Sequence, residues 1–186
     1  MNDNLKLYIK NNLGYFDNFT EKVKREVNEN IGLRKAAICG FLNRCESPIE
    51  QLLAVNFIDL EFQLYAELSI LDKFKSVHIE PQKEVLANKR KYRLDFLIEV
   101  IFDKNSFKFA IECDGHDFHE RTKEQAARDK ARERNLTMNG YRVVRFTGSE
   151  IWTDSTACIS DLYKIICHET GLDDYYQELT KTDLGT

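Results

Sequence analysis

The chain has 186 residues, of which 42% are hydrophobic and 31% charged, and its formal net charge is −4. This length suits one domain of ordinary size, and the 12 Phe and 8 Tyr exclude an intrinsically disordered chain. No apolar run approaches the roughly 20 residues that span a bilayer, and the first residues lack a secretion signal, so we expect a cytoplasmic protein without a membrane partner. The five cysteines contain no C-x-x-C pair, which argues against a zinc site.

The first part of the sequence has the periodicity of helices. Residues 1–44 are expected to form a helical extension, because apolar residues recur there at four-residue spacing. A second helix is predicted over 47–67, with Ser47 as its N-cap and Pro48 in its first turn. Glu50 lies three residues after the cap, as in a capping box.

From residue 77 the apolar period changes to two, which indicates strands. The segment 77–85 is expected to form a first strand, interrupted or bent at Pro81. Two clearly alternating runs, 92–102 and 106–115, are joined by a turn-prone D-K-N-S segment. These two runs therefore predict a β-hairpin.

The last part of the sequence returns to alternating helix and strand. We expect a helix over 119–139, a strand over 141–148 that is apolar enough to be internal, and a helix from 154 or 155 to 168. The order of elements favours an α/β domain with helices flanking a sheet. The expected organisation is a helical extension over 1–44, a folded domain over 45–168 and a loose tail over 169–186.

Side-chain parity in the predicted hairpin brings three carboxylates together. A two-residue loop would place Asp95 opposite Glu112, and a four-residue loop would place it opposite Asp114. In either case the three side chains project from one face, where their mutual repulsion must be relieved by water, protonation or a cation. A hard cation such as Mg²⁺ or Mn²⁺ suits such a set. The competing interpretation is the solvated polar face of an ordinary hairpin.

The helix predicted after the hairpin is locally basic, although the acidic net charge counts against a protein that holds nucleic acid mainly by charge. Arg121, Arg128 and Arg132 fall near one another at helical spacing, and Arg145 lies on the following strand. These four residues are candidates for contacts with a phosphate backbone. The alternative is a solvated helix face of mixed charge.

The run R-L-D-F at 93–96, followed by F-A-I-E-C-D-G-H-D-F-H at 109–119, resembles the PD-(D/E)XK nuclease superfamily. The closer likeness is to bacterial endonuclease-like domains related to the very short patch repair endonuclease. It covers roughly residues 45–155, from C-E-S-P-I-E-Q-L-L and P-Q-K-E-V to A-A-R-D-K-A-R-E-R-N-L and G-Y-R-V-V-R-F-T-G-S-E-I-W. The resemblance implies a restriction-endonuclease-like core with a mixed central sheet, Mg²⁺-dependent phosphodiester hydrolysis and DNA as partner, and it leaves a homodimer open.

The resemblance also implies roles for individual residues. Glu50 matches an acid that completes the metal shell through water, although it can also simply cap its helix. Gln82 matches a polar residue of the first strand, or it is an ordinary edge-strand residue, and His119 could transfer a proton, hold a phosphate or serve as a local hydrogen-bond partner. The candidate set is Glu50, Asp95, Glu112, Asp114 and His119 for catalysis, Asp95, Glu112 and Cys113 for the metal, and Gln82, Arg121, Arg128, Arg132 and Arg145 for nucleic acid.

One position departs from the superfamily pattern. A lysine is expected two residues after the second acid, and this chain has Asp114 there, which leaves the general base unassigned. The candidate substitutes are Lys83, Lys108, Lys123 and His119. We therefore carry three hypotheses: a metal-dependent DNA endonuclease, a non-catalytic nucleic-acid-binding or regulatory module on a decayed nuclease fold, and a hydrolase of another phosphate ester.

Overall fold

The computed structural model describes residues 20–115 and 122–183, which divide into two units between Gly40 and Phe41. The first unit contains most of helix α2 (Glu21–Leu42), which agrees with the helical periodicity of this part of the sequence. The second unit contains α3 (Pro48–Ala54), α4 (Phe57–Leu68), β1 (Phe74–Ala87), β2 (Arg90–Phe102), β3 (Ser106–Asp114), α5 (Lys123–Met138), β4 (Tyr141–Thr147), α6 (Gly148–Thr170) and α7 (Leu172–Asp183). Within the described ranges, no helix is long and apolar enough to cross a membrane.

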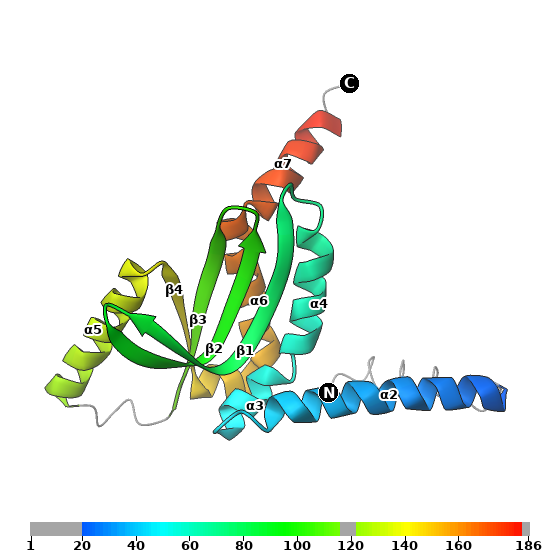
Figure 1. Ribbon diagram of the computed structural model, residues 1–186, viewed down its shortest axis with the longest axis horizontal. Helices are drawn as coiled ribbons and strands as arrows, with labels where there is room; N and C mark the ends of the chain where they lie inside the picture. Colours follow the sequence, from blue (N-terminus) through cyan, green and yellow to red (C-terminus); the bar gives the residue numbers. More distant parts are fainter. Residues whose placement is uncertain (1–19, 116–121, 184–186) are drawn as a thin grey trace. The chain divides into compact units, whose positions relative to one another are not determined.

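The four strands form one mixed sheet in the order β1-β2-β3-β4 (Figure 1). β1 pairs antiparallel with β2 and β2 antiparallel with β3, whereas β3 and β4 are parallel and are connected through α5. This mixed sheet with flanking helices confirms the predicted α/β class and is compatible with a restriction-endonuclease-like core.

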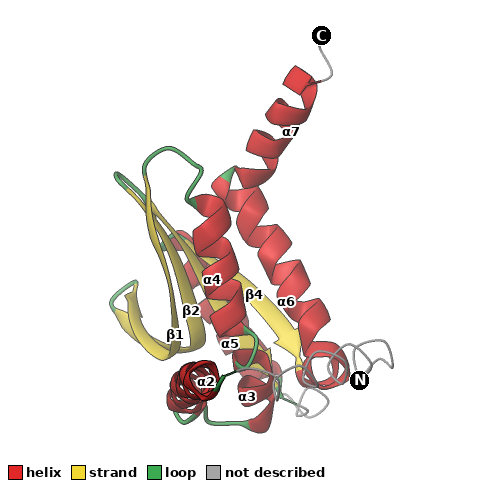
Figure 2. Ribbon diagram, turned by 90° about the vertical axis from the view of Figure 1, so that its right-hand side faces the viewer, coloured by secondary structure: helices red, strands yellow, loops and turns green. Residues whose placement is uncertain are grey.

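Helices cover both faces of the sheet. The larger core lies on the face that α3, α4 and α6 cover, and it contains the fully buried side chains of Leu64, Phe96 and Leu162. The smaller core lies on the other face, where Leu136 of α5 packs against Leu97 and its neighbours. Figures 1 and 2 show α4 and α6 along one side of the strands and α5 on the other.

The strand β4 lies at the edge of the sheet, so the expectation of an internal strand over 141–148 is wrong. Its apolar character has a different cause. Val144 and Phe146 pack into the larger core, while Val143 packs against the smaller one. An edge strand that is covered on both faces by helices needs the same side chains as an internal strand.

The register of the β2–β3 hairpin resolves the two loop lengths that the sequence allowed. Ile101 pairs with Ser106, and the N–H of Phe102 donates to the carbonyl of Asn105 at 2.9 Å. Only Asp103 and Lys104 remain as the loop, so the two-residue alternative is the one that the structure adopts. This register continues to place Asp95 opposite Glu112.

A second hairpin, between β1 and β2, was not predicted. Ala87 pairs with Arg90 across a two-residue turn, in which Asn88 and Lys89 have φ values of 49° and 63°. Such positive values at both central residues are typical of the type I′ turn that matches strand twist. β1 runs through Pro81 without a break in its assignment, which an edge strand tolerates.

The helices differ from the predictions at three places. The helix expected over 47–67 is divided into α3 and α4, with a break at Val55 and Asn56. α6 begins at Gly148 rather than at 154 or 155, and the predicted start coincides with a kink at Asp154 (φ −156°, ψ 86°). Asp154 accepts from the N–H of Ala157 at 3.0 Å, so the sequence signal for a helix cap was genuine but lies inside a longer helix.

The third difference concerns the segment after residue 168, where a loose tail was expected. α6 continues to Thr170 and ends at Gly171 in the left-handed conformation, and α7 then extends to Asp183.

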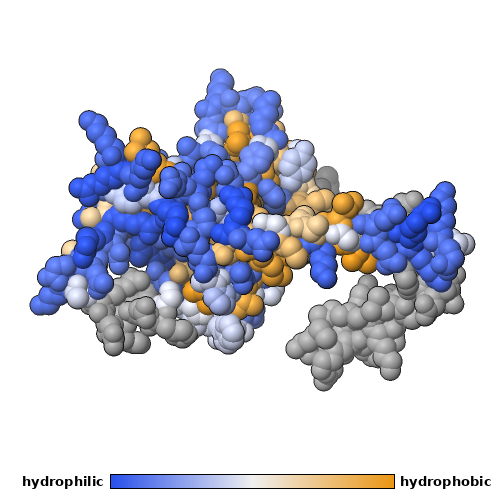
Figure 3. Space-filling view, turned by 60° about the horizontal axis from the view of Figure 1, so that its bottom comes forward, coloured by the Kyte–Doolittle hydropathy of each residue, from blue (hydrophilic) through white to orange (hydrophobic). Residues whose placement is uncertain are grey.

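In the view of Figure 3, hydrophilic residues cover most of the described surface. Single apolar side chains such as Phe62 and Met138 are nevertheless exposed, as is normal for a folded domain.

Candidate functional site

Asp95 and Glu112 lie one residue beyond the last registered pair of β2 and β3. That pair, Phe96 and Ile111, packs into the larger core, so the next side chains on both strands point toward the opposite face, which α5 covers. Glu112 is only 5% exposed there. The structure thus brings the two predicted carboxylates together on the face that parity assigned to them.

The carboxylate of Asp95 is held by the backbone. The N–H of Cys113 donates to its Oδ2 at 2.6 Å. Burial raises the pKa of Asp95, the N–H of Cys113 opposes this shift, and the negative charges of Glu50 and Asp114 add to it. These contributions indicate that Glu50 and Asp114 lie close enough to Asp95 to repel its negative charge.

Glu112 is a buried carboxylate with a raised pKa. Burial raises the pKa of its carboxyl to about 7, the guanidinium of Arg132 opposes this shift, and Asp95 adds to it. Arg132 donates from Nη1 to Oε2 at 2.5 Å and from Nη2 to Oε1 at 2.8 Å. The Nη2 of Arg132 also donates to the carbonyl of Arg93 at 2.5 Å, which ties the guanidinium to β2.

Glu50 caps its helix, which is one of the two roles that the sequence left open. It belongs to the cap of α3, where its N–H donates to the hydroxyl of Ser47 and that hydroxyl donates back to Oε1 at 2.8 Å. Its Oε2 accepts from the N–H of Glu46 at 2.9 Å and from Nε2 of Gln82 at 2.7 Å. Glu50 therefore caps α3 and also binds Gln82, the candidate residue on β1.

Gln82 lies at an irregular point of β1. Its φ is 53°, and the register passes from the pair Pro81–Phe96 to the pair Lys83–Leu94 without including it. Among the residues that the structure describes, its Oε1 is buried and has no hydrogen-bond partner. An acceptor of this kind fits a water molecule or a hard cation.

Arg145 is registered beside Glu112 on the neighbouring parallel strand. Its Nη2 lies 3.7 Å from Oε2 of Glu133, while its Nε is buried and has no partner within the described ranges. Arg128 lies on the exposed surface of α5, and its Nε donates to the carbonyl of Glu124 at 3.4 Å. These two arginines retain donors that could meet a phosphate.

The superfamily pattern expects a lysine where this chain has Asp114, and three described lysines were candidates to replace it. None of the three contacts Glu112. Lys83 bonds to both carboxylate oxygens of Glu80, and Lys108 lies 3.8 Å from Glu99 and over the ring of Tyr141. Lys123 is exposed at the start of α5. Among the residues that the structure describes, Arg132 is the positively charged side chain that pairs with Glu112. His119 and Arg121 lie outside the described residues.

Cys113 contributes its backbone rather than its thiol to the geometry. Its side chain packs against the larger core, and burial raises the pKa of the thiol far above its usual range. No group of three His, Cys, Asp or Glu side chains in residues 20–115 and 122–183 is arranged to hold a metal ion. The hard oxygen donors of Asp95 and Glu112 nevertheless suit Mg²⁺ or Mn²⁺ in their chemistry, with the unpartnered Oε1 of Gln82 beside Glu50.

The inward orientation of Arg132 was missed by the sequence analysis, which placed this residue against a phosphate. A signal was present, because Leu136 follows Arg132 by four residues and is the buried apolar residue of α5. Residues four apart share one face of a helix, so Arg132 faces the sheet together with Leu136.

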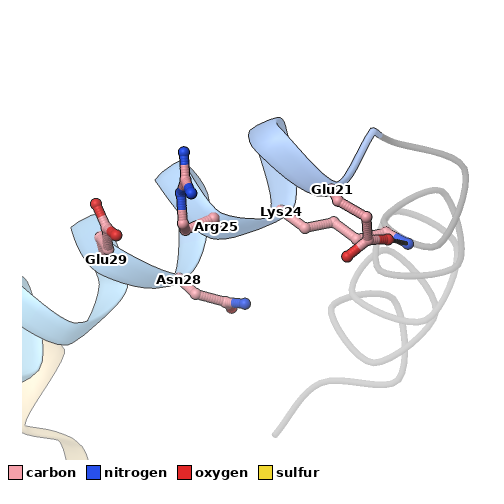
Figure 4. Close-up of a pocket in the computed structure, with 5 residues that line it drawn as sticks. All are labelled: Glu21, Lys24, Arg25, Asn28 and Glu29. Atoms are coloured by element: carbon pink, nitrogen blue, oxygen red, sulfur yellow. Dashed lines mark hydrogen bonds and ion pairs between the residues drawn. The ribbon is translucent and has the colours of Figure 1, made fainter.

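A separate hollow lies along α2 in the first unit and is shown in Figure 4. It is lined by side chains of mixed charge at helical spacing, and Lys24 pairs with Glu21 at 2.9 Å. The lining residues that the structure describes all belong to this one helix: Glu21, Lys24, Arg25, Asn28 and Glu29. Such a surface is typical of a solvated helix, and none of the predicted site residues that the structure describes is among its lining residues.

One comparison places the chain among known proteins. A family model, REase_MTES_1575, matches residues 67–166, which is more than half of the chain. The matched segment contains Asp95, Glu112 and Arg132, whereas Glu50 precedes it. No curated protein and no solved structure gives a significant match.

Proposed function

The chain belongs to the REase_MTES_1575 family, which is restriction-endonuclease-like, and on this premise we propose that it is a DNA endonuclease that depends on a divalent cation. The observation that carries the proposal is the carboxylate pair of half-buried Asp95 and buried Glu112, on adjacent strands within the matched segment. Family membership supports nuclease-type function, and the metal dependence and the choice of DNA are our proposals.

In this proposal Asp95 and Glu112 hold Mg²⁺ or Mn²⁺, and Cys113 fixes Asp95 through its N–H. Glu50 and Gln82 supply further oxygen donors at the edge of the site. The bound cation would polarise the scissile phosphate and lower the pKa of the attacking water.

The positive residues on the same side of the sheet would orient the nucleic acid. Arg145 has a buried donor without a partner among the described residues, and Arg128 is exposed one turn before Arg132. We propose that both contact phosphate oxygens. Arg121 and His119 remain proposals from the sequence, as do the closer likeness to the very short patch repair type and a homodimer.

Cleavage of duplex, mismatched and single-stranded DNA, and of RNA, with Mg²⁺ or Mn²⁺ tests this proposal. Asp95→Asn and Glu112→Gln keep the shape of each side chain, and each should reduce cleavage on the order of 100-fold or more, since charge stabilisation by the cation is lost. Asp59→Asn, a matched change at an exposed position of α4, should leave cleavage unchanged. Equal activity in all four proteins would refute the proposal, and cleavage of RNA alone would favour the hydrolase of another phosphate ester.

A second candidate function is a nucleic-acid-binding module without catalysis. It is favoured by Asp114 at the position of the expected lysine and by the engagement of Glu112 with Arg132. Calorimetry with Mn²⁺ separates the two functions. DNA binding that persists in a protein with neither Mn²⁺ binding nor cleavage would support the non-catalytic module.

A further inference from the structure

We propose that Arg132 is the built-in counter-ion of the Asp95–Glu112 site, and that a divalent cation must displace its guanidinium from Glu112 in order to bind. The inference rests on the proposed function, because it concerns the same carboxylates. It makes Arg132 a positioning residue that sets the affinity for the cation.

The first argument is the geometry of the ion pair. Both Nη atoms of Arg132 donate to the two different carboxylate oxygens of Glu112, so the guanidinium occupies both oxygens at once. Arginine binds a carboxylate most strongly in this bidentate arrangement. A divalent cation that binds Glu112 would therefore meet a guanidinium hydrogen-bonded to both oxygens, and the two positive groups would repel each other at the same carboxylate.

The second argument is that the guanidinium is fixed in place. Its Nη2 donates to the carbonyl of Arg93, and the side chain of Arg132 is only 26% exposed. Leu136, one turn later on α5, is fully buried against the sheet and holds this face of the helix toward β2 and β3. The pair is thus largely buried and held against the sheet, unlike an ion pair on the solvent-exposed surface.

The third argument is that the other arginines near the site pair with other carboxylates. The nearby Arg93 is committed to a bidentate pair with Glu46 at 2.8 and 2.7 Å. Arg145 is registered beside Glu112, but its shortest ion pair is with Glu133. Of the described cations, Arg132 is therefore the one that directly neutralises the carboxylate pair, as a divalent cation would.

The exchange has a consequence for substrate binding. Once a cation has replaced it, the guanidinium of Arg132 has two N–H donors available beside the site, and these donors match a phosphate as well as a carboxylate. Binding of the cation and binding of the nucleic acid should then reinforce each other, because each removes a competitor of the other.

Titration calorimetry with Mn²⁺ alone tests the inference, since its readout does not depend on activity. Arg132→Gln removes the competing charge, so the variant should bind Mn²⁺ on the order of tenfold more tightly than the wild type, as loss of about 1.4 kcal/mol of competition would give. Arg134→Gln removes one positive charge from an exposed position of the same helix and should bind Mn²⁺ like the wild type. The double variant Glu112→Gln/Arg132→Gln should lose the gain, which locates the effect at Glu112.

The sign of the change decides the outcome. Weaker or unchanged Mn²⁺ binding by Arg132→Gln would overturn the inference and leave the proposed function standing, because Arg132 would then only orient Glu112. Absence of Mn²⁺ binding in the wild type and in every variant would overturn the proposed function as well. Thermal unfolding with and without Mn²⁺ checks folding, and the metal should stabilise a folded Arg132→Gln variant more than it stabilises the wild type.

Discussion

Replacing Glu112 by Gln should make the metal-free protein respond less to pH. Glu112 is 5% exposed, and its carboxyl has a pKa of about 7 in the folded chain, against an ordinary value of 4.5. Burial is the largest cause of this shift, and the guanidinium of Arg132 only partly opposes it. The folded state therefore binds more protons at this residue than the unfolded state does between these two pH values.

The size of the effect follows from the shift. A raised pKa contributes stability that is present below pH 4.5 and is lost as the pH rises through about 7. One pKa unit corresponds to about 1.4 kcal/mol, so the wild type should lose about 3 kcal/mol through Glu112 over this range. A glutamine has no such proton to lose, and the variant should escape this part of the decline.

The assay is urea unfolding in the presence of a chelator, at pH 4.5 and at pH 8. The quantity to compare is the change in the free energy of unfolding between the two pH values, because any constant cost of the substitution cancels. The wild type should fall by about 3 kcal/mol more than Glu112→Gln. Glu84→Gln, an exposed glutamate on a strand of the same sheet, serves as the matched control and should behave like the wild type.

Equal pH dependence of the wild type and Glu112→Gln would refute this reasoning. It would mean that the ion pair with Arg132 offsets burial completely and keeps Glu112 charged throughout. Addition of Mn²⁺ at pH 8 supplies an independent check. If the carboxylates bind the cation, Mn²⁺ should restore stability to the wild type and not to the variant.

Three further predictions concern the fold of the chain. Burial raises the pKa of Cys45 to about 11, whereas Cys39 is exposed, so Ellman's reagent should label Cys39 in the native protein and Cys45 only after unfolding; rapid labelling of native Cys45 would contradict this. Gly171 ends α6 with a φ of 79°, so Gly171→Ala should lower the free energy of urea unfolding by about 1 kcal/mol, and no loss would be inconsistent with that conformation. Leu162 is fully buried in the larger core, and Leu162→Ala should cost about 3 kcal/mol in the same assay; a cost below about 1 kcal/mol would mean that the core is not packed as described.

The sequence by itself determined the elements whose pattern is local. Alternation over 92–102 and 106–115 predicted the hairpin, and parity placed Asp95 and Glu112 on one face, whichever even loop joined the strands. This inference was robust because the side-chain period of a strand does not depend on its surroundings. The mixed sheet came from the resemblance rather than from periodicity, and the structure agrees with it.

Tertiary structure decided which groups meet across the chain. The edge position of β4 and the kink at Asp154 depend on what packs against each element, and no local period records that. The partner of Glu112 is the clearest case. Arg132 has the helical spacing of a surface residue that contacts phosphate, but α5 turns that face toward the sheet, where a buried carboxylate requires a partner. The sequence thus determined that the carboxylates would gather, and only the fold decided which cation neutralises them.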